Sequence, residues 1–153
     1  MVRFVNRLDR TARLNIADIG SLNVNGDYRG LFNAPTWKYV GVDMNPGQNV
    51  DVVVDGETDW KNIEDQTFDL VISGQTMEHV RMPWIWMMEI RRILRRGGQA
   101  FIVAPHTHHE HNFPVDCWRV FPEGMKALMA WCGFYDVKTW KNSTDTVGWG
   151  KRP

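Results

Sequence analysis

Residues 68–104 read FDLVISGQTMEHVRMPWIWMMEIRRILRRGGQAFIVA, and this stretch carries the clearest structural pattern in the chain. Its two ends, 68–72 and 100–104, are short apolar runs bounded by turn residues, which is typical of buried parallel strands. Between them, residues 83–96 carry apolar side chains at helical spacing. Pro83 suits the first helical position, and Gly97–Gly98 suits the terminus. The stretch therefore predicts two parallel strands joined through a helix by a right-handed crossover.

The same alternation continues on both sides of this stretch. Three earlier apolar runs, at 14–19, 38–42 and 50–54, are each followed by Gly or Asp. After the stretch, we expect a second helix at about 122–131 and a weaker strand at 133–140. Strands that alternate with helices predict an α/β fold, here a three-layer sandwich around a mostly parallel sheet.

The composition indicates one domain, residues 1–153, because the chain has no repeat and no linker rich in Pro, Gly or Ser. Its 18 Lys and Arg balance 18 Asp and Glu, which argues against a nucleic-acid partner. The balance hides an asymmetry, since residues 1–80 carry a net charge of −5 and residues 81–153 carry +5.

The expected location is the cytoplasm, without a membrane partner. No apolar run approaches the roughly 20 residues that span a bilayer, and Arg and Asp interrupt the first ten residues, MVRFVNRLDR. Cys117 and Cys132 show neither a disulfide framework nor zinc spacing, so we interpret them as reduced thiols.

Small and acidic residues follow the first three strands, where parallel sheets bind ligands. Asp43 ends the second strand, and a carboxylate there can accept hydrogen bonds from both hydroxyls of a ribose. The loop after Gly20 lacks the further glycines that a pyrophosphate needs, so a ligand with a ribose but no phosphate fits better.

S-adenosylmethionine is such a ligand, because it joins an adenosine to a zwitterionic amino-acid tail. Asp18 could receive the ammonium of the tail, and N–H groups of the Gly20 loop could meet its carboxylate. Asp55, after the third strand, could accept from the adenine amine. Simple capping of strand ends is the other interpretation of Asp43 and Asp55, and it ranks lower because the two occur together at the expected places.

Five segments, in this order and spacing, resemble class I S-adenosylmethionine-dependent methyltransferases, and among them the type 11 methyltransferase domain. The resemblance covers about residues 14–140. The segments are ADIGSLNVNG at 17–26, YVGVDM at 39–44, DVVVDG at 51–56, FDLVISGQTMEHV at 68–80 and EIRRILRRGGQAFIVAP at 89–105.

The resemblance implies a Rossmann-like methyltransferase sheet with strand order 3-2-1-4-5 and the 133–140 strand beyond it. This family usually closes with an antiparallel hairpin. Because only thirteen residues follow Trp140, we expect reduced C-terminal strands, with the last one short, irregular or absent.

The resemblance also implies which residues bind the cofactor. The first motif departs from the family's alternating glycines, with Asn25–Gly26 as a substitute turn. The expected residues are Asp18, Gly20, Ser21 and Asn25 at the methionine tail, Asp43 and Met44 at the ribose and adenine, Asp55 and Gly56 near the adenine amine, and Ser73 and Gly74 beneath the methionine moiety.

Four of the five histidines lie within residues 106–111, in the segment PHTHHEHNFP. The pattern H-x-H-x-acid-H resembles metallo-β-lactamase-fold hydrolases, so a zinc-dependent hydrolase using His106–His111 is an alternative function. It ranks lower because no histidine follows His111, and we assign no metal to the site. A non-catalytic cofactor-binding module is the third hypothesis.

For a methyltransferase, the loop after the fifth strand would lie over the reactive methyl. A neutral imidazole could take a proton from the acceptor, which is expected to be a small molecule. Its pocket would come from residues 105–121 or from a second subunit of a homo-oligomer, and the product would be S-adenosylhomocysteine. The candidates are His79, His106 and His108 for catalysis, and His109, His111, Asp116, Trp118 and Arg119 for the substrate side.

Two further groups of side chains are interpreted as structural. We expect the arginines at 91, 92, 95 and 96 to form a solvated face at the end of the helix. Trp84, Trp86, Trp131 and Trp140 are expected to be core or helix-packing residues rather than cofactor aromatics, and neither Trp37 nor Trp60 is expected to stack on the cofactor.

Overall fold

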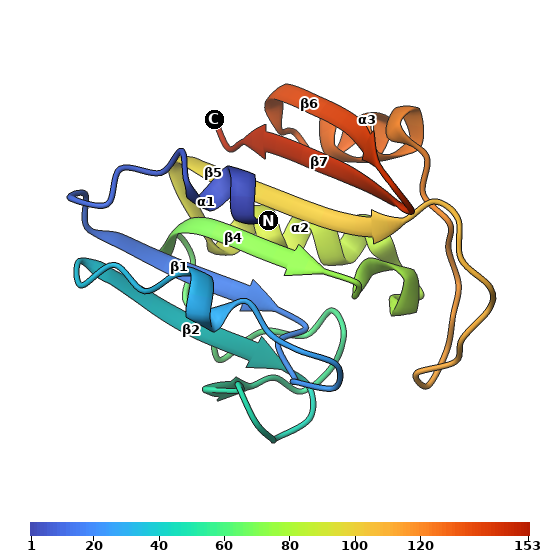
Figure 1. Ribbon diagram of the computed structural model, residues 1–153, viewed down its shortest axis with the longest axis horizontal. Coiled ribbons are helices and arrows are strands. Elements are labelled where there is room, and N and C mark those ends of the chain that lie inside the picture. Colours follow the sequence, from blue (N-terminus) through green and yellow to red (C-terminus); the bar gives the residue numbers. More distant parts are fainter.

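The computed structural model describes all 153 residues, whose strands and helices alternate along most of the chain (Figure 1). The elements are α1 (Val2–Val5), β1 (Leu14–Ile19), the 3₁₀ helix η1 (Arg29–Leu31), β2 (Trp37–Asp43), β3 (Val52–Val53), β4 (Phe68–Gly74), the 3₁₀ helix η2 (Met77–His79), α2 (Pro83–Ile93), β5 (Leu94–Pro105), α3 (Pro122–Trp131), β6 (Tyr135–Asn142) and β7 (Asp145–Lys151).

The strands form one sheet in the order β3-β2-β1-β4-β5-β7-β6. Pairing is parallel from β3 to β5, and β7 runs antiparallel to both of its neighbours. This topology confirms the expected order of the first five strands and the mostly parallel, Rossmann-like sheet.

The expectation that the last strand is short, irregular or absent was wrong. β7 has seven residues and pairs with β5 along its whole length, from Gln99–Lys151 to Pro105–Asp145. Only Ser143 and Thr144 separate β6 from β7, and Ser143 adopts a left-handed φ of 48°. So tight a hairpin leaves enough of the thirteen C-terminal residues for a complete strand.

Two apolar cores lie on the two faces of the sheet. In Figure 1, α2 and α3 lie behind the sheet, and α1 and η1 lie in front of it. The core on the α2 and α3 face has 23 buried residues, including Trp86 and Met125, whereas the other has 10, including Val5 and Phe32. None of the helices has the length and apolar character that crossing a bilayer requires.

The helix after β4 ends three residues earlier than expected. Leu94 already has the extended φ and ψ of −72° and 143° and pairs with Phe68, so the next residues belong to β5. Arg92 is not part of a solvated face: its guanidinium donates to the carbonyl oxygens of Ile63 at 2.8 Å and Trp60 at 2.9 Å. The end of α2 therefore holds the segment that follows β3.

The four tryptophans expected in the core or packed on helices differ in their burial. Trp86 is 1% exposed, as expected for the core, but the other three are on the surface. Their exposed fractions are 41% for Trp84, 67% for Trp131 and 43% for Trp140.

Candidate active site

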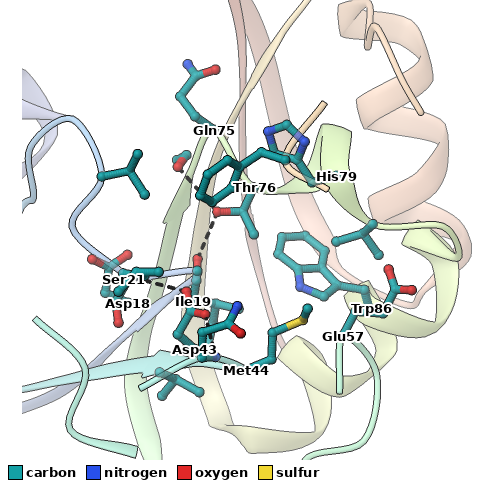
Figure 2. Close-up of a pocket in the computed structure, with 18 of the residues that line it drawn as sticks. Asp18, Ile19, Ser21, Asp43, Met44, Glu57, Gln75, Thr76, His79 and Trp86 are labelled. Carbon is teal, nitrogen blue, oxygen red and sulfur yellow. Dashed lines mark hydrogen bonds between the residues drawn. The ribbon is translucent and has the colours of Figure 1, made fainter. Parts of the chain in front are cut away.

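A cavity of about 690 Å³ lies at the carboxyl ends of β1, β2 and β4. Figure 2 shows Asp18 and Asp43 on one side of this pocket and His79 and Trp86 on the other. Of the ten residues expected at a cofactor, eight line the cavity: Asp18, Gly20, Ser21, Asn25, Asp43, Met44, Gly56 and Gly74.

The structure does not bring Asp55 and Ser73 to the cavity. Asp55 is exposed and outside the lining, because Val54 turns inward and the next side chain of an extended segment points the other way. Ser73 is fully buried, and its hydroxyl donates to the carbonyl oxygen of Ile19 at 2.7 Å. Ser73 thus ties β4 to β1, and Glu57 is the carboxylate after β3 that lines the cavity.

Asp18 is a buried carboxyl at the end of β1, with 3% exposure. Burial raises its pKa to about 7, and the hydrogen bond from the Tyr39 hydroxyl opposes this shift. Asp27 and Asp43 add to the rise, whereas Arg29 lowers the pKa. A cationic ligand group beside Asp18 would favour its ionised form.

Close backbone approach requires glycine at two positions of the lining. Gly20 has a φ of 77°, and a Cβ there would lie 2.1 Å from Thr76 Oγ1. A Cβ at Gly74 would lie 2.2 Å from the Tyr28 hydroxyl. These two glycines therefore set the width of the cavity between β1 and β4.

Most N–H groups of the Gly20 loop are already used within the chain. Those of Gly20 and Ser21 donate to the carbonyl oxygen of Val42, at 2.9 and 3.1 Å. The next two, of Leu22 and Asn23, donate to Asp43 and to the Gln48 carbonyl oxygen. The N–H groups of Val24 and Asn25 make no hydrogen bond, so they are the donors that the loop keeps for a ligand.

Asp43 is held in place by backbone donors on both oxygens. Its Oδ2 accepts from Leu22 N at 3.1 Å, and its Oδ1 accepts from Asn45 N at 2.9 Å. Each carboxylate oxygen can accept more than one hydrogen bond, so both retain capacity for hydroxyl groups in the cavity. The carboxylate is thus oriented before any ligand arrives.

Sequence reasoning missed several of the lining residues. Trp60 and Trp86 are 2% and 1% exposed and form an apolar wall. Asp27 and Glu57 add two carboxylates to Asp18 and Asp43, and the one guanidinium, Arg81, pairs with Glu57 at 3.0 Å. Asp27 and Glu57 lie in loops some residues after the strands, so the sequence alone does not show whether their side chains face the cavity. The cavity is negative overall and suits a cationic ligand.

The segment after β5 contributes one of its histidines to the cavity. His111 lines it beside His79, and the two rings meet edge to face with centroids 5.1 Å apart. The structure leaves His106, His108 and His109 outside the lining: His106 stacks on Phe121, and the other two are exposed.

The remaining expected substrate residues hold this segment together. Asp116 pairs with Arg119 at 2.6 Å, and this bond lowers the pKa of the Asp116 carboxyl. The Trp118 indole donates to the carbonyl oxygen of Val80 at 2.8 Å. None of the three lines the cavity.

The histidine pattern of a zinc hydrolase does not assemble a metal site. Within 106–111, only His111 belongs to a group of three metal-type ligands, and its companions are Glu78 and His79 from η2. The structure therefore gives the hydrolase alternative no support.

Comparison with known proteins agrees with the topology. Residues 18–102 match a family model described as "Methyltransferase domain". No protein with a curated description matches the sequence.

Solved structures show the same fold at low sequence identity. The CurJ carbon methyltransferase is 15% identical with a TM-score of 0.75, over 96% of this chain and 50% of that one. A SAM-dependent methyltransferase from Archaeoglobus fulgidus is 17% identical with a TM-score of 0.75, over 98% and 90%. Phosphoethanolamine N-methyltransferase 2 of Haemonchus contortus, in complex with S-adenosyl-L-methionine, is 14% identical with a TM-score of 0.69, over 91% and 48%. The chain thus spans about half of CurJ and most of the archaeal protein.

Proposed function

The chain belongs to the methyltransferase-domain family, and we therefore propose that it moves a methyl group from S-adenosylmethionine to an O, N or C nucleophile of a small molecule. The product of the cofactor would be S-adenosylhomocysteine. The Haemonchus contortus structure, whose fold is similar, is described with S-adenosyl-L-methionine bound, which supports the choice of cofactor.

The observation that carries the proposal is the acid-lined cavity at the strand ends. Its volume of about 690 Å³ is within the usual range for small-molecule sites, about 300–1,000 Å³. S-adenosylmethionine carries a sulfonium and an ammonium against one carboxylate. Four carboxylates and one paired guanidinium in the lining match this net positive charge.

The lining residues suggest how the cofactor would be oriented. We place the ammonium at Asp18, the ribose hydroxyls at Asp43, and the tail carboxylate at the N–H groups of Val24 and Asn25. Glu57 replaces Asp55 as the carboxylate nearest to the adenine amine.

The protein's part in the reaction is alignment and exclusion of water. The bound cofactor supplies the reactive sulfonium methyl. Trp60 and Trp86 form a dry apolar wall of the cavity, and His79 and His111 border the part of it where we place the acceptor. Holding the acceptor atom in line with the methyl accounts for much of the acceleration that such a site can give.

Calorimetry with S-adenosylmethionine and S-adenosylhomocysteine, in metal-free buffer, tests the proposal. Asp43→Ala should weaken binding at least about 30-fold, because hydrogen bonds to a charged acceptor contribute roughly 1.5–3 kcal/mol each. Asp55→Ala is the matched control, since it removes a strand-end carboxylate outside the cavity, and its affinity should equal that of the wild type.

Two outcomes would contradict the proposal. An absence of heat with both ligands at millimolar concentration would remove the cofactor site altogether. Unchanged affinity in Asp43→Ala would show that the ligand binds elsewhere. A protein that binds the cofactor but forms no S-adenosylhomocysteine with a broad set of acceptors would be a non-catalytic module.

A further inference from the structure

Glu78 is a buried carboxylate that the cofactor site does not use. It lies in η2, has 0% exposure, and neither of its carboxylate oxygens has a hydrogen-bond partner. Its Oε1 lies 3.7 Å from Nε2 of His79. Glu78, His79 and His111 bring three ligand atoms within 4.8 Å of one another. An unpartnered carboxylate beside two imidazoles is an arrangement that a cation stabilises.

Polar neighbours hold both imidazoles of the cluster in place. His79 Nδ1 lies 2.6 Å from the carbonyl oxygen of Val115, which can only accept, so Nδ1 carries the proton and Nε2 keeps a lone pair. His111 Nδ1 lies 3.2 Å from the carbonyl oxygen of His109 and 3.3 Å from Asp116 Oδ2, and Arg119 holds that carboxylate. Carboxylates and carbonyl oxygens fix metal-binding histidines in this way.

The two segments that supply the cluster are fastened to each other. Cys117 N donates to the Glu78 carbonyl oxygen at 2.7 Å, and the Trp118 indole donates to the Val80 carbonyl oxygen at 2.8 Å. Together with the bond between His79 and Val115, these contacts hold residues 111–118 against η2. The three ligand side chains therefore depend on one rigid junction rather than on a free loop.

We propose that Glu78, His79 and His111 bind one divalent transition-metal ion at the acceptor side of the cavity. Two imidazole nitrogens and one carboxylate are a common ligand set for zinc in catalytic sites, where a further position stays open. Because His79 and His111 line the cavity, the open position would face it. Neighbouring ligands of tetrahedral zinc lie about 3.3 Å apart, so small side-chain rotations would close the set.

A cation there would define the class of acceptor, and this step rests on the proposed methyltransferase function. The ion would bind a hydroxyl oxygen of the acceptor and lower the pKa of that hydroxyl. The proton passes to solvent, an oxygen lone pair forms the new C–O bond, and the electron pair of the broken C–S bond stays on sulfur. The acceptor is then an alcohol, a phenol or an enol, and the reaction is O-methylation.

Titration of the chelator-treated protein with Zn²⁺, without any cofactor, tests the site. We expect one equivalent to bind with a dissociation constant of about 1 μM or lower. Glu78→Gln and His111→Ala should each weaken binding at least about 100-fold, since even outer residues of metal sites change affinity 10- to 100-fold. His108→Ala is the matched control, because His108 is an exposed histidine of the same segment outside the cluster, and it should leave the zinc affinity unchanged.

Cofactor binding, measured separately on the same metal-free variants, distinguishes the two proposals. If the Glu78→Gln variant still binds S-adenosylmethionine, it is folded, and its loss of zinc binding would then support the metal site. Absence of stoichiometric zinc in the wild type would overturn the site and leave the cofactor proposal intact. Loss of zinc in His108→Ala with retention in Glu78→Gln would also overturn it. Zinc binding without cofactor binding would instead contradict the proposed function.

Discussion

Asp18 and Asp43 lie at the carboxyl ends of the neighbouring strands β1 and β2, but their surroundings differ. Asp18 is buried, and its main partner is the Tyr39 hydroxyl. Asp43 is half-buried and accepts from two backbone N–H groups. Burial makes the charge of Asp18 sensitive to pH near neutrality, because it raises the pKa of this carboxyl to about 7. The contribution of Asp18 to cofactor binding should therefore depend on pH near neutrality.

S-adenosylmethionine should bind more tightly as the pH rises from 5.5 to about 7, and the affinity should then level off. Below pH 7 the Asp18 carboxyl of the free protein holds a proton that the ligand's ammonium must displace. One displaced proton changes the affinity by up to about tenfold per pH unit. Tyr39, Arg29, Asp27 and Asp43 are the charged or titratable groups that act on this carboxyl. Calorimetry at pH 5.5, 6.5 and 7.5 measures the slope.

Asp18→Asn is the control for this pH dependence. It should bind more weakly at pH 7.5 and show a flat profile, so an unchanged slope would assign the proton to another group.

Without ligand, the free energy of unfolding should fall as the pH rises from about 4 to 7. The sign follows because the folded protein retains a proton that the unfolded chain, with a carboxyl pKa of 3.8, has released.

Among the elements, the C-terminal end of α2 holds a part of the cavity wall in place. Arg92 reaches the carbonyl oxygens of Trp60 and Ile63, and it pairs with Glu89 and Asp65. Trp60 in turn forms part of the cavity wall. The segment after β3 has little regular structure of its own, since β3 has only two residues. The guanidinium of Arg92 is one of the groups that fix the position of this segment, together with the pair between Arg81 and Glu57.

Arg92→Ala should lower the free energy of unfolding by about 2–3 kcal/mol, because it leaves two carbonyl oxygens and two carboxylates without their charged donor. It should also weaken cofactor binding through the displaced Trp60. Arg96→Ala is the control, since Arg96 is exposed and makes no hydrogen bond, and it should change stability by less than about 0.5 kcal/mol. Urea unfolding of both variants measures the difference, and equal losses would contradict the role of Arg92.

The sequence predicts best those elements whose ends are marked by local residues such as turn residues or a proline. The range of β1 and that of α3 match their expectations, because turn residues and Pro122 mark their ends. The end of α2 was missed because Leu94 pairs with Phe68, a long-range contact that overrides helical spacing. The full length of β7 was missed because it depends on how tightly the hairpin at Ser143 turns.

Some residues of the candidate site could likewise be predicted from local pattern, whereas others depend on long-range contacts. The positions of Asp18 and Asp43 could be predicted because both residues lie at or next to the carboxyl end of a strand in a parallel sheet. That Glu57 rather than Asp55 lines the cavity could not be predicted, because the conformation of the turn after β3 determines which side chain faces inward. The cluster of Glu78 with His79 and His111 could not be predicted either, because His111 comes from a segment more than thirty residues later that folds back against η2.

At the scale of the whole molecule, the two faces of the sheet are covered unequally. α2 and α3 cover one face with a core of 23 buried residues, whereas α1, η1 and loops cover the other with 10. On the thinner face, Phe4 of α1 stacks on Phe101 of β5 with ring centroids 4.2 Å apart, and Val5 is 3% exposed. The first turn of the chain therefore seals that face.

Val5→Asp should lower the free energy of unfolding by about 3 kcal/mol, because it buries an unpaired carboxylate against the sheet. For a chain of this length the midpoint of thermal unfolding should fall by about 6–12 °C. Val2→Asp is the matched control on the same helix, since Val2 is 55% exposed, and its midpoint should stay near that of the wild type. Calorimetric melting that shows equal midpoints for both variants would mean that α1 does not seal the face.

The outer strands of the sheet affect how copies of the protein meet. β3 offers only Val52 and Val53 for pairing. At the opposite edge, β6 carries Lys138 and Lys141, and its register with β7 is irregular near Asp136, whose φ is 52°. An outer strand that is very short, or charged and kinked, is a poor template for a strand from another molecule. Collisions between crowded copies should therefore not extend the sheet from one chain to the next, and the open sheet is protected against edge-to-edge aggregation.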